Sequence, residues 1–180
     1  DMPFESYENT ELALTNAKHL VSVGADMVKI EGGREHEEIF RVLASNDINV
    51  CGHLGLQPQL VIDSSDYKIQ GRDKDSAESI MSDAILLESL GISVLVLECI
   101  PSDLARNVSS KIGIPTIGIG AGNGCDGQVL VSYDMLGISL GKQPRFVRNF
   151  LSSESSISLA IKAFVSEVKE GSFPNKSESY

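Results

Sequence analysis

The chain has 180 residues, is 42% apolar and carries a formal net charge of −10 at pH 7. This length suits one domain, and the apolar content suffices for a packed core, which argues against a disordered protein. The acidic charge argues against nucleic acid as a partner, because phosphate binding needs a basic face. No apolar run approaches the length of a membrane span, so we expect no membrane contact. The cysteines lack CxxC spacing, which indicates reduced thiols and a cytoplasmic protein.

Helix and strand patterns alternate along the chain. In chain order we predict a first helix that Thr10 caps and that runs to about 23, a strand at 27–31, a helix at 34–45 and a strand at 48–54. A helix at 75–90, a strand at 94–98, a helix at 101–110, strands at 116–120 and 128–131, and helices at 146–150 and 157–168 follow. Five strands separated mostly by helices predict a parallel sheet of the α/β class. The irregular stretch 57–73 has the length of a lid or binding loop. We expect the polar residues 172–180 to form a loose tail behind one domain of residues 1–171.

A repeat places a carboxylate at the end of two predicted strands. Glu31 and Glu98 each lie seven positions after a glycine that closes a helix, Gly24 and Gly91. A third copy, 113–120, keeps the register but ends in glycine. Since α/β enzymes place their chemistry at the C-terminal ends of parallel strands, the repeat indicates a site there.

Lys29 and Glu31 lie two positions apart on one predicted strand, so their side chains share a face. On an otherwise apolar strand, an ammonium and a carboxylate are costly unless they are paired or bind something. Two interpretations follow. The residues form either a structural ion pair on the inner face of a barrel or part of a ligand site.

Further candidates lie near other strand ends. His53 shares a face with Cys51, and it is either a pocket residue or a satisfied core histidine. Glu98 has no cation on its own strand, which suits a general base, and the alternative is a helix cap or loop acceptor. The glycine-rich segment 118–124 precedes a strand rather than the helix that a phosphate loop requires. We therefore favour the interpretation that these glycines, which lack side chains, let a ligand approach the backbone closely.

Seven motifs together resemble a known family. They read MVKIEGG at 27–33, VCGHLGL at 50–56, YKIQGR at 67–72, LECIP at 97–101, IGIGAG at 117–122, DGQVLV at 126–131 and PRFVRNF at 144–150. In these motifs the sequence resembles ketopantoate hydroxymethyltransferase, a family of pantothenate synthesis. The likeness runs through essentially the whole chain, and the motifs are more specific together than any one alone.

The resemblance implies a (β/α)8 TIM barrel of the phosphoenolpyruvate mutase-like superfamily. The barrel is incomplete here, because about five parallel strands are too few to close it. The resemblance also implies transfer of a hydroxymethyl group from 5,10-methylenetetrahydrofolate to α-ketoisovalerate, which gives ketopantoate. It implies Mg²⁺ as the cofactor, small molecules as partners, and a cytoplasmic homodecamer.

The family pattern further implies a role for five residues. Asp1 matches a magnesium-binding aspartate, and Glu31 matches a glutamate near the metal. Lys29 matches a lysine that contacts the keto acid, and His53 matches a histidine of the substrate pocket. Glu98 matches the catalytic base. The family's first strands, with a second metal-binding aspartate and a serine, are not in the sequence, so we expect part of a longer chain that by itself binds Mg²⁺ poorly and self-associates.

Two other functions stay open at this point. One is a related Mg²⁺-dependent C–C lyase that acts on 2-oxo acids, although the Lys-Lys-Cys-Gly-His type of motif of that group is missing. The other is a non-catalytic barrel fragment that acts by assembling with a partner.

Overall fold

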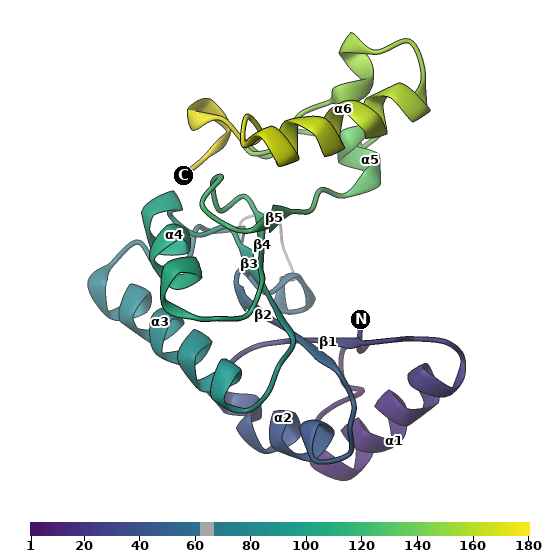
Figure 1. Ribbon diagram of the computed structural model, residues 1–180, viewed down its shortest axis with the longest axis vertical. Helices are drawn as coiled ribbons and strands as arrows, with labels where there is room; N and C mark the ends of the chain where they lie inside the picture. Colours follow the sequence, from purple (N-terminus) through teal and green to yellow (C-terminus); the bar gives the residue numbers. More distant parts are fainter. Residues whose placement is uncertain (62–66) are drawn as a thin grey trace.

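The computed structural model describes residues 1–61 and 67–180 and contains a five-stranded sheet. The strands follow the chain order: β1 (Val28–Glu31), β2 (Val50–Gly55), β3 (Val94–Glu98), β4 (Thr116–Ile119) and β5 (Gly127–Gln128). Each strand pairs in parallel with the next. Within the described residues the sheet is barrel-like but open between β1 and β5 (Figure 1). The prediction of an α/β fold with an incomplete barrel of five parallel strands is confirmed.

Helices connect the strands and cover the sheet. They are α1 (Thr10–Ser22), α2 (Glu37–Ala44), α3 (Lys74–Ser89), α4 (Ser102–Lys111), α5 (Ser132–Met135) and α6 (Ile157–Glu170), with 3₁₀ turns η1 (Arg34–His36), η2 (Pro58–Leu60), η4 (Phe150–Ser153) and η5 (Lys176–Glu178). Figure 1 shows α1 to α4 in a row along the outer side of the sheet, whereas α5 and α6 lie beyond β5. Among the described residues, no helix is both long and apolar enough to cross a lipid bilayer.

Several predicted boundaries differ from the structure for local reasons. The cap of α1 is Asn9, whose side chain accepts a hydrogen bond from the N–H of Leu12. The strand predicted at 128–131 is shorter, since β5 has 2 residues. The helix predicted at 146–150 is wrong, because a 3₁₀ turn begins only at Phe150. Phe150 points into a core there, so tertiary packing overrides the local helical pattern.

The alternation of side chains along the strands decides which residues face the inner side of the sheet. Ile30, Leu95 and Leu97 are buried in the core that the outer helices share, so their strand neighbours point the other way. The parallel register aligns Glu31 with His53. The inner face therefore carries Lys29, Glu31, Cys51, His53, Val96 and Glu98.

The outer face of the sheet and helices α1 to α4 share one core. Its fully buried side chains include Ile30, Phe40, Leu43, Leu87 and Leu95. Burial of one such side chain contributes roughly 1.5–3 kcal/mol to folding. This core holds β1, β2 and β3 in register, and their carboxyl ends carry the candidate site.

A second core lies under α6 and includes the C-terminal segment. Phe150, Phe164 and Phe173 pack edge to face, with ring centroids 5.2, 5.5 and 5.7 Å apart. Arg148 lies over the ring of Phe173 and donates from Nε to Glu178 at 2.6 Å. Residues 172–180 are therefore packed, and the expectation of a loose segment is wrong. Phe173 and Glu178 have partners that are distant in sequence.

Candidate active site

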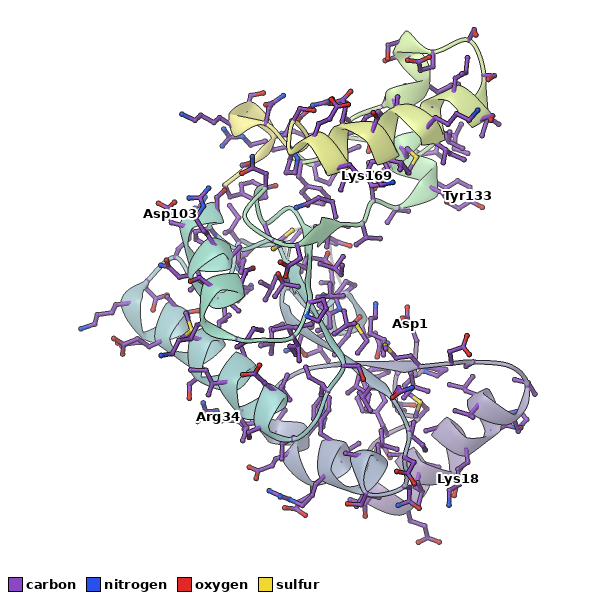
Figure 2. All side chains as sticks on the ribbon, in the orientation of Figure 1. Asp1, Lys18, Arg34, Asp103, Tyr133 and Lys169 are labelled. Atoms are coloured by element: carbon purple, nitrogen blue, oxygen red, sulfur yellow. The ribbon has the colours of Figure 1, made fainter. Side chains whose placement is uncertain are left out.

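The inner face of the sheet gathers the predicted residues at the carboxyl ends of β1, β2 and β3. Figure 2 shows Asp1 on this inner side, whereas Lys18 and Arg34 lie on the outer helical side. Asp1 is held there by its neighbour: Met2 is fully buried, and its N–H donates to the carbonyl oxygen of Lys29 at 2.9 Å. Asp1 therefore lies beside β1 and within reach of its inner-face side chains.

His53 lies between two carboxylates. Its Nε2 is 3.1 Å from Oε2 of Glu98, and its Nδ1 is 3.6 Å from Oε1 of Glu31. All three residues are buried, with exposed fractions of 1% for His53, 7% for Glu98 and 5% for Glu31. Buried carboxylates are costly unless they have a partner. The imidazole is the partner that both carboxylates share.

The hydrogen-bonding capacity of His53 is not used up by these contacts. Within the described residues neither ring nitrogen makes an aligned hydrogen bond, although Nε2 lies close to Glu98. The distance allows an electrostatic contact, but the angle does not aim an N–H at the oxygen. Since buried polar groups are nearly always paired, this arrangement favours a pocket histidine over a satisfied core histidine.

Glu31 is positioned by the loop that follows β2. The backbone N–H of Gln59 donates to Oε2 of Glu31 at 2.9 Å. The Gln59 side chain accepts from the hydroxyl of Tyr7 at 2.8 Å and donates to the carbonyl of Met2 at 2.9 Å. Burial and, secondarily, the charge of Glu31 raise the pKa of Tyr7. The loop therefore connects Glu31 with the first residues of the chain.

Lys29 pairs with Asp1 rather than with Glu31. Nζ of Lys29 is 3.1 Å from Oδ1 of Asp1, and the two side chains are 25% and 63% exposed. The ion pair between Lys29 and Glu31 that one interpretation expected is not observed among the described residues, because Glu31 contacts Gln59 and His53 instead. Solvent-exposed pairs contribute roughly 0–1 kcal/mol, so the Asp1 pair does not commit Lys29 to a structural role.

A cavity of about 660 Å³ opens beside Glu98. We call it the β3–β5 cavity, because its walls come from the ends of β3 and β4, the chain after β5 and the end of the 57–73 loop. Its lining includes Tyr67, Lys68, Glu98, Asp134, Lys142 and Tyr180. Part of the predicted binding loop thus does line a cavity at the site, while residues 62–66 of that loop lie outside the described residues.

Cys99 follows Glu98 and also lines the β3–β5 cavity. Burial and, to a lesser extent, the charge of Glu98 raise the pKa of Cys99 to about 12. The thiol is therefore neutral at physiological pH and a poor nucleophile. The pKa of Tyr67 is also raised, first by burial and then by the charge of Glu98, and both residues line the β3–β5 cavity.

Asp1 and Glu31, the two residues that the resemblance places at a metal, both carry carboxylates on the inner side of the sheet. The described residues contain no group of three or more His, Cys, Asp or Glu side chains placed to hold a metal ion. Mg²⁺ nevertheless prefers carboxylate oxygens, and one or two of them commonly suffice when water and substrate complete its coordination. The donor chemistry therefore fits a Mg²⁺ ion held jointly with a substrate.

The sequence patterns did not identify Gln59 and Tyr7 as site residues, nor Asp134 and Lys142 on the wall of the β3–β5 cavity. A signal existed for Gln59, which belongs to the stretch 57–73 predicted as a binding loop. Asp134 and Lys142 had no such signal, because they lie in and after α5, a helix of 4 residues that is too short for a periodic pattern.

Comparison with known proteins identifies relatives along the whole chain. The family model "Ketopantoate hydroxymethyltransferase" matches residues 1–176. Proteins named 3-methyl-2-oxobutanoate hydroxymethyltransferase from Ruthia magnifica and Vesicomyosocius okutanii are 59% and 56% identical over 180 residues, which is 100% of this chain and 69% of each relative. One of the same name from Edwardsiella ictaluri is 49% identical over 174 residues, or 97% of this chain and 66% of that relative.

A solved structure, the YdjI aldolase from Escherichia coli K12, is 15% identical to this chain. The match covers 86% of this chain and 60% of the aldolase chain. Its TM-score of 0.36 is too low to inform the fold. The sequence relatives are far closer, and they confirm the resemblance seen in the motifs. They also favour a hydroxymethyltransferase over the C–C lyase alternative. The chain belongs to the ketopantoate hydroxymethyltransferase family.

Proposed function

We propose that this site transfers a hydroxymethyl group to α-ketoisovalerate and forms ketopantoate for pantothenate and coenzyme A synthesis. The position of Glu98 carries the proposal. It is a buried carboxylate at the end of β3, 3.1 Å from Nε2 of His53, on the wall of a cavity of about 660 Å³. The relatives' name supports the choice of substrate, because 3-methyl-2-oxobutanoate is α-ketoisovalerate.

Glu98 is the group that takes the proton from the β-carbon of the keto acid. This proton is acidic because the neighbouring keto group delocalises the charge that its removal leaves. A positioned general base is worth about 10²–10⁴ in rate. His53 lies beside the Glu98 carboxylate, and a ring nitrogen that makes no aligned hydrogen bond among the described residues is available to the substrate. The Lys29 ammonium offsets the negative charge that develops on the substrate oxygen.

Asp1 and Glu31 would hold a Mg²⁺ ion together with the substrate and water. When bound, the ion supplies Lewis acidity toward the keto oxygen. The protein's own contribution is to position the two carboxylates. The Met2 N–H ties residue 1 to β1, and the Gln59 N–H fixes one oxygen of Glu31.

The one-carbon unit in this proposal comes from 5,10-methylenetetrahydrofolate. Water cleaves both bonds between the methylene carbon and the folate nitrogens, giving its hydrogens to the nitrogens and its oxygen to the carbon. The β-carbon of the keto acid then forms the new C–C bond to that carbon. The proton held by Glu98 passes to the new hydroxyl oxygen, so atoms balance and nothing is oxidised or reduced.

The proposal includes two kinds of partner, small-molecule substrates and further copies of this chain. The copies assemble into a cytoplasmic homodecamer. Exposed apolar side chains on α6 support self-assembly, since Ile157 and Ile161 are 53% and 46% exposed. Apolar surface of this kind commonly marks an interface.

Deuterium exchange tests the role of Glu98. In a protein that carries the family's first strands ahead of these residues, α-ketoisovalerate and Mg²⁺ in D₂O should give exchange of the β-hydrogen, and Glu98→Gln should slow this exchange by about 10²–10⁴. Glu170→Gln removes an exposed carboxylate at the end of α6 and serves as the matched control. Near-normal exchange by Glu98→Gln, with binding of the keto acid retained, would rule out Glu98 as the base.

A further inference from the structure

Gln59 contacts both of the segments that carry the carboxylates of the proposed metal site. Its backbone N–H donates to Oε2 of Glu31 at 2.9 Å, and its side-chain amide donates to the carbonyl of Met2 at 2.9 Å. The same amide accepts a hydrogen bond from the hydroxyl of Tyr7 at 2.8 Å. Because Met2 directly follows Asp1, one residue of the loop after β2 joins β1 to the segment that contains Asp1.

Met2 is held at both of its backbone polar groups. Its N–H donates to the carbonyl of Lys29 at 2.9 Å, and its carbonyl accepts from Gln59. One hydrogen bond would let the chain turn about that contact, whereas a bond at each end of the residue fixes its direction. Gln59 therefore fixes the direction in which the chain presents Asp1. The side chain of Asp1 is 63% exposed and stays accessible to a ligand.

The Gln59 N–H also orients the carboxylate of Glu31. Glu31 borders two spaces, which are the inner face beside His53 and a separate cavity of about 240 Å³ that Tyr7 and Gln59 also line. Because Oε2 accepts from Gln59, Oε1 is the oxygen left for the inner face, 3.6 Å from Nδ1 of His53. A buried carboxylate without this donor would lose a partner that solvent does not replace.

We propose that Gln59 is a positioning residue for the Mg²⁺ site, which holds the carboxylates of Asp1 and Glu31 where one ion can contact both. This inference rests on the proposed function. Gln59 itself contacts neither the ion nor the substrate, and it acts through the two carboxylates. Replacement of a group that is bonded to the ligands of a metal commonly costs roughly 10- to 100-fold in metal affinity or activity.

Tyr7 orients the Gln59 amide and offers a way to separate positioning from stability. Its hydroxyl donates to the amide oxygen, so the amide nitrogen faces the carbonyl of Met2. Loss of the Tyr7 hydroxyl leaves the Gln59 donor in place, whereas loss of the Gln59 amide removes both bonds. Both changes remove the bond between the two side chains, and only a change at Gln59 removes the bond next to Asp1.

Metal binding without turnover tests the inference. The protein should carry the family's first strands ahead of these residues, and the probe is Mn²⁺, which suits the same oxygen ligands as Mg²⁺ and is followed by electron paramagnetic resonance. Gln59→Met keeps the length of the side chain, and it should weaken Mn²⁺ binding by about tenfold, the lower end of the range because the N–H to Glu31 remains. Tyr7→Phe should weaken it much less. Gln57→Met makes the same change in the same loop and is the matched control.

A kinetic measurement distinguishes positioning from a merely structural role. In deuterium exchange with α-ketoisovalerate, Gln59→Met should need more Mg²⁺ for half of its maximal rate and should approach the wild-type rate when the ion is in excess. Glu98→Gln lacks the base and should stay slow at every Mg²⁺ concentration. Thermal unfolding of Gln59→Met and Tyr7→Phe measures how much stability each variant has lost.

The results separate this inference from the proposed function. A Mn²⁺ affinity of Gln59→Met equal to that of Gln57→Met would overturn the positioning role, even in a protein that exchanges deuterium. An equal loss in Tyr7→Phe and Gln59→Met would also overturn it, because the loss would then follow their shared bond. Gln59-dependent Mn²⁺ binding by a protein that shows no exchange would support the positioning role and refute the proposed reaction. A wild-type protein that binds no Mn²⁺ would overturn the metal site and this inference together.

Discussion

The burial of individual side chains distinguishes the roles of the charged residues on the inner face. Glu31 and Glu98 are buried and each lies against the buried His53, so removal of one of these three side chains would take a partner from another. Lys29 and Asp1 reach solvent, and their mutual contact is weak by comparison. Substitution of a buried residue of this site therefore lowers the free energy of unfolding. Substitution of Lys29 tests its function with little effect on folding.

Lys29→Met is expected to change the free energy of unfolding by less than about 1 kcal/mol, because only an exposed ion pair is lost. Activity should collapse in the same variant if the ammonium holds the keto acid. Thermal unfolding and deuterium exchange measure the two effects, and Lys18→Met controls for the added apolar side chain. A stable and fully active Lys29→Met protein would show that Lys29 does not bind the keto acid.

At the scale of elements, the loop after β2 joins the chain start to the sheet. Gln59 contacts Glu31 through its backbone, and its side chain contacts Tyr7 and Met2. These bonds bridge positions 28, 52 and 57 residues apart in sequence. The placement of Asp1 beside Lys29 therefore depends on this loop as well as on β1.

Gln59→Ala should destabilise the protein by about 1–3 kcal/mol, since two side-chain hydrogen bonds are lost and each is worth roughly 0.5–1.5 kcal/mol. Tyr7→Phe should cost about 0.5–1.5 kcal/mol. Because the two side chains share one bond, the double variant should cost less than the sum. Urea unfolding of the wild type and the three variants completes the cycle, and strict additivity would show that the Tyr7–Gln59 bond contributes nothing.

At the scale of the whole molecule, the C-terminal segment contacts both α6 and the start of α4. Arg148 binds Glu167 and Glu178, and the N–H and hydroxyl of Ser102 at the start of α4 both donate to the carbonyl of Tyr180. The segment thus closes one wall of the β3–β5 cavity. Its attachment depends on an ionised carboxylate.

Acid should loosen this segment. Burial acts to raise the pKa of Glu178, but hydrogen bonds from Arg148 and the Asn175 N–H outweigh it, so the pKa lies below its ordinary value of 4.5. Such a group stabilises the fold fully above its unfolded pKa, and the contribution disappears as pH falls from about 4.5 through the lower folded value. Unfolding free energies between pH 7 and 3 should fall less steeply in Glu178→Gln. At pH 7 the free energy of unfolding of that variant should be about 1–3 kcal/mol lower than that of the wild type. If the free energy of unfolding of the variant falls with pH as steeply as that of the wild type, Glu178 is not the carboxylate responsible.

Local periodicity was enough to predict the α/β class, the parallel strands and most helix boundaries. Apolar alternation and helical spacing act over a few residues, so the sequence displays them directly. The same reasoning predicted that Glu31, His53 and Glu98 end strands. Since parallel strands bring their carboxyl ends to one edge, it also predicted that these residues share a site.

Which groups touch within that site was decided by tertiary structure alone. The sequence suggested Lys29 with Glu31 because they share a strand face, but the structure pairs Lys29 with Asp1 and Glu31 with Gln59 and His53. The β3–β5 cavity likewise combines residues 67 to 180, and the segment 172–180 finds its partners across the second core. These contacts join segments distant in sequence, and their geometry depends on packing and register that no local pattern records.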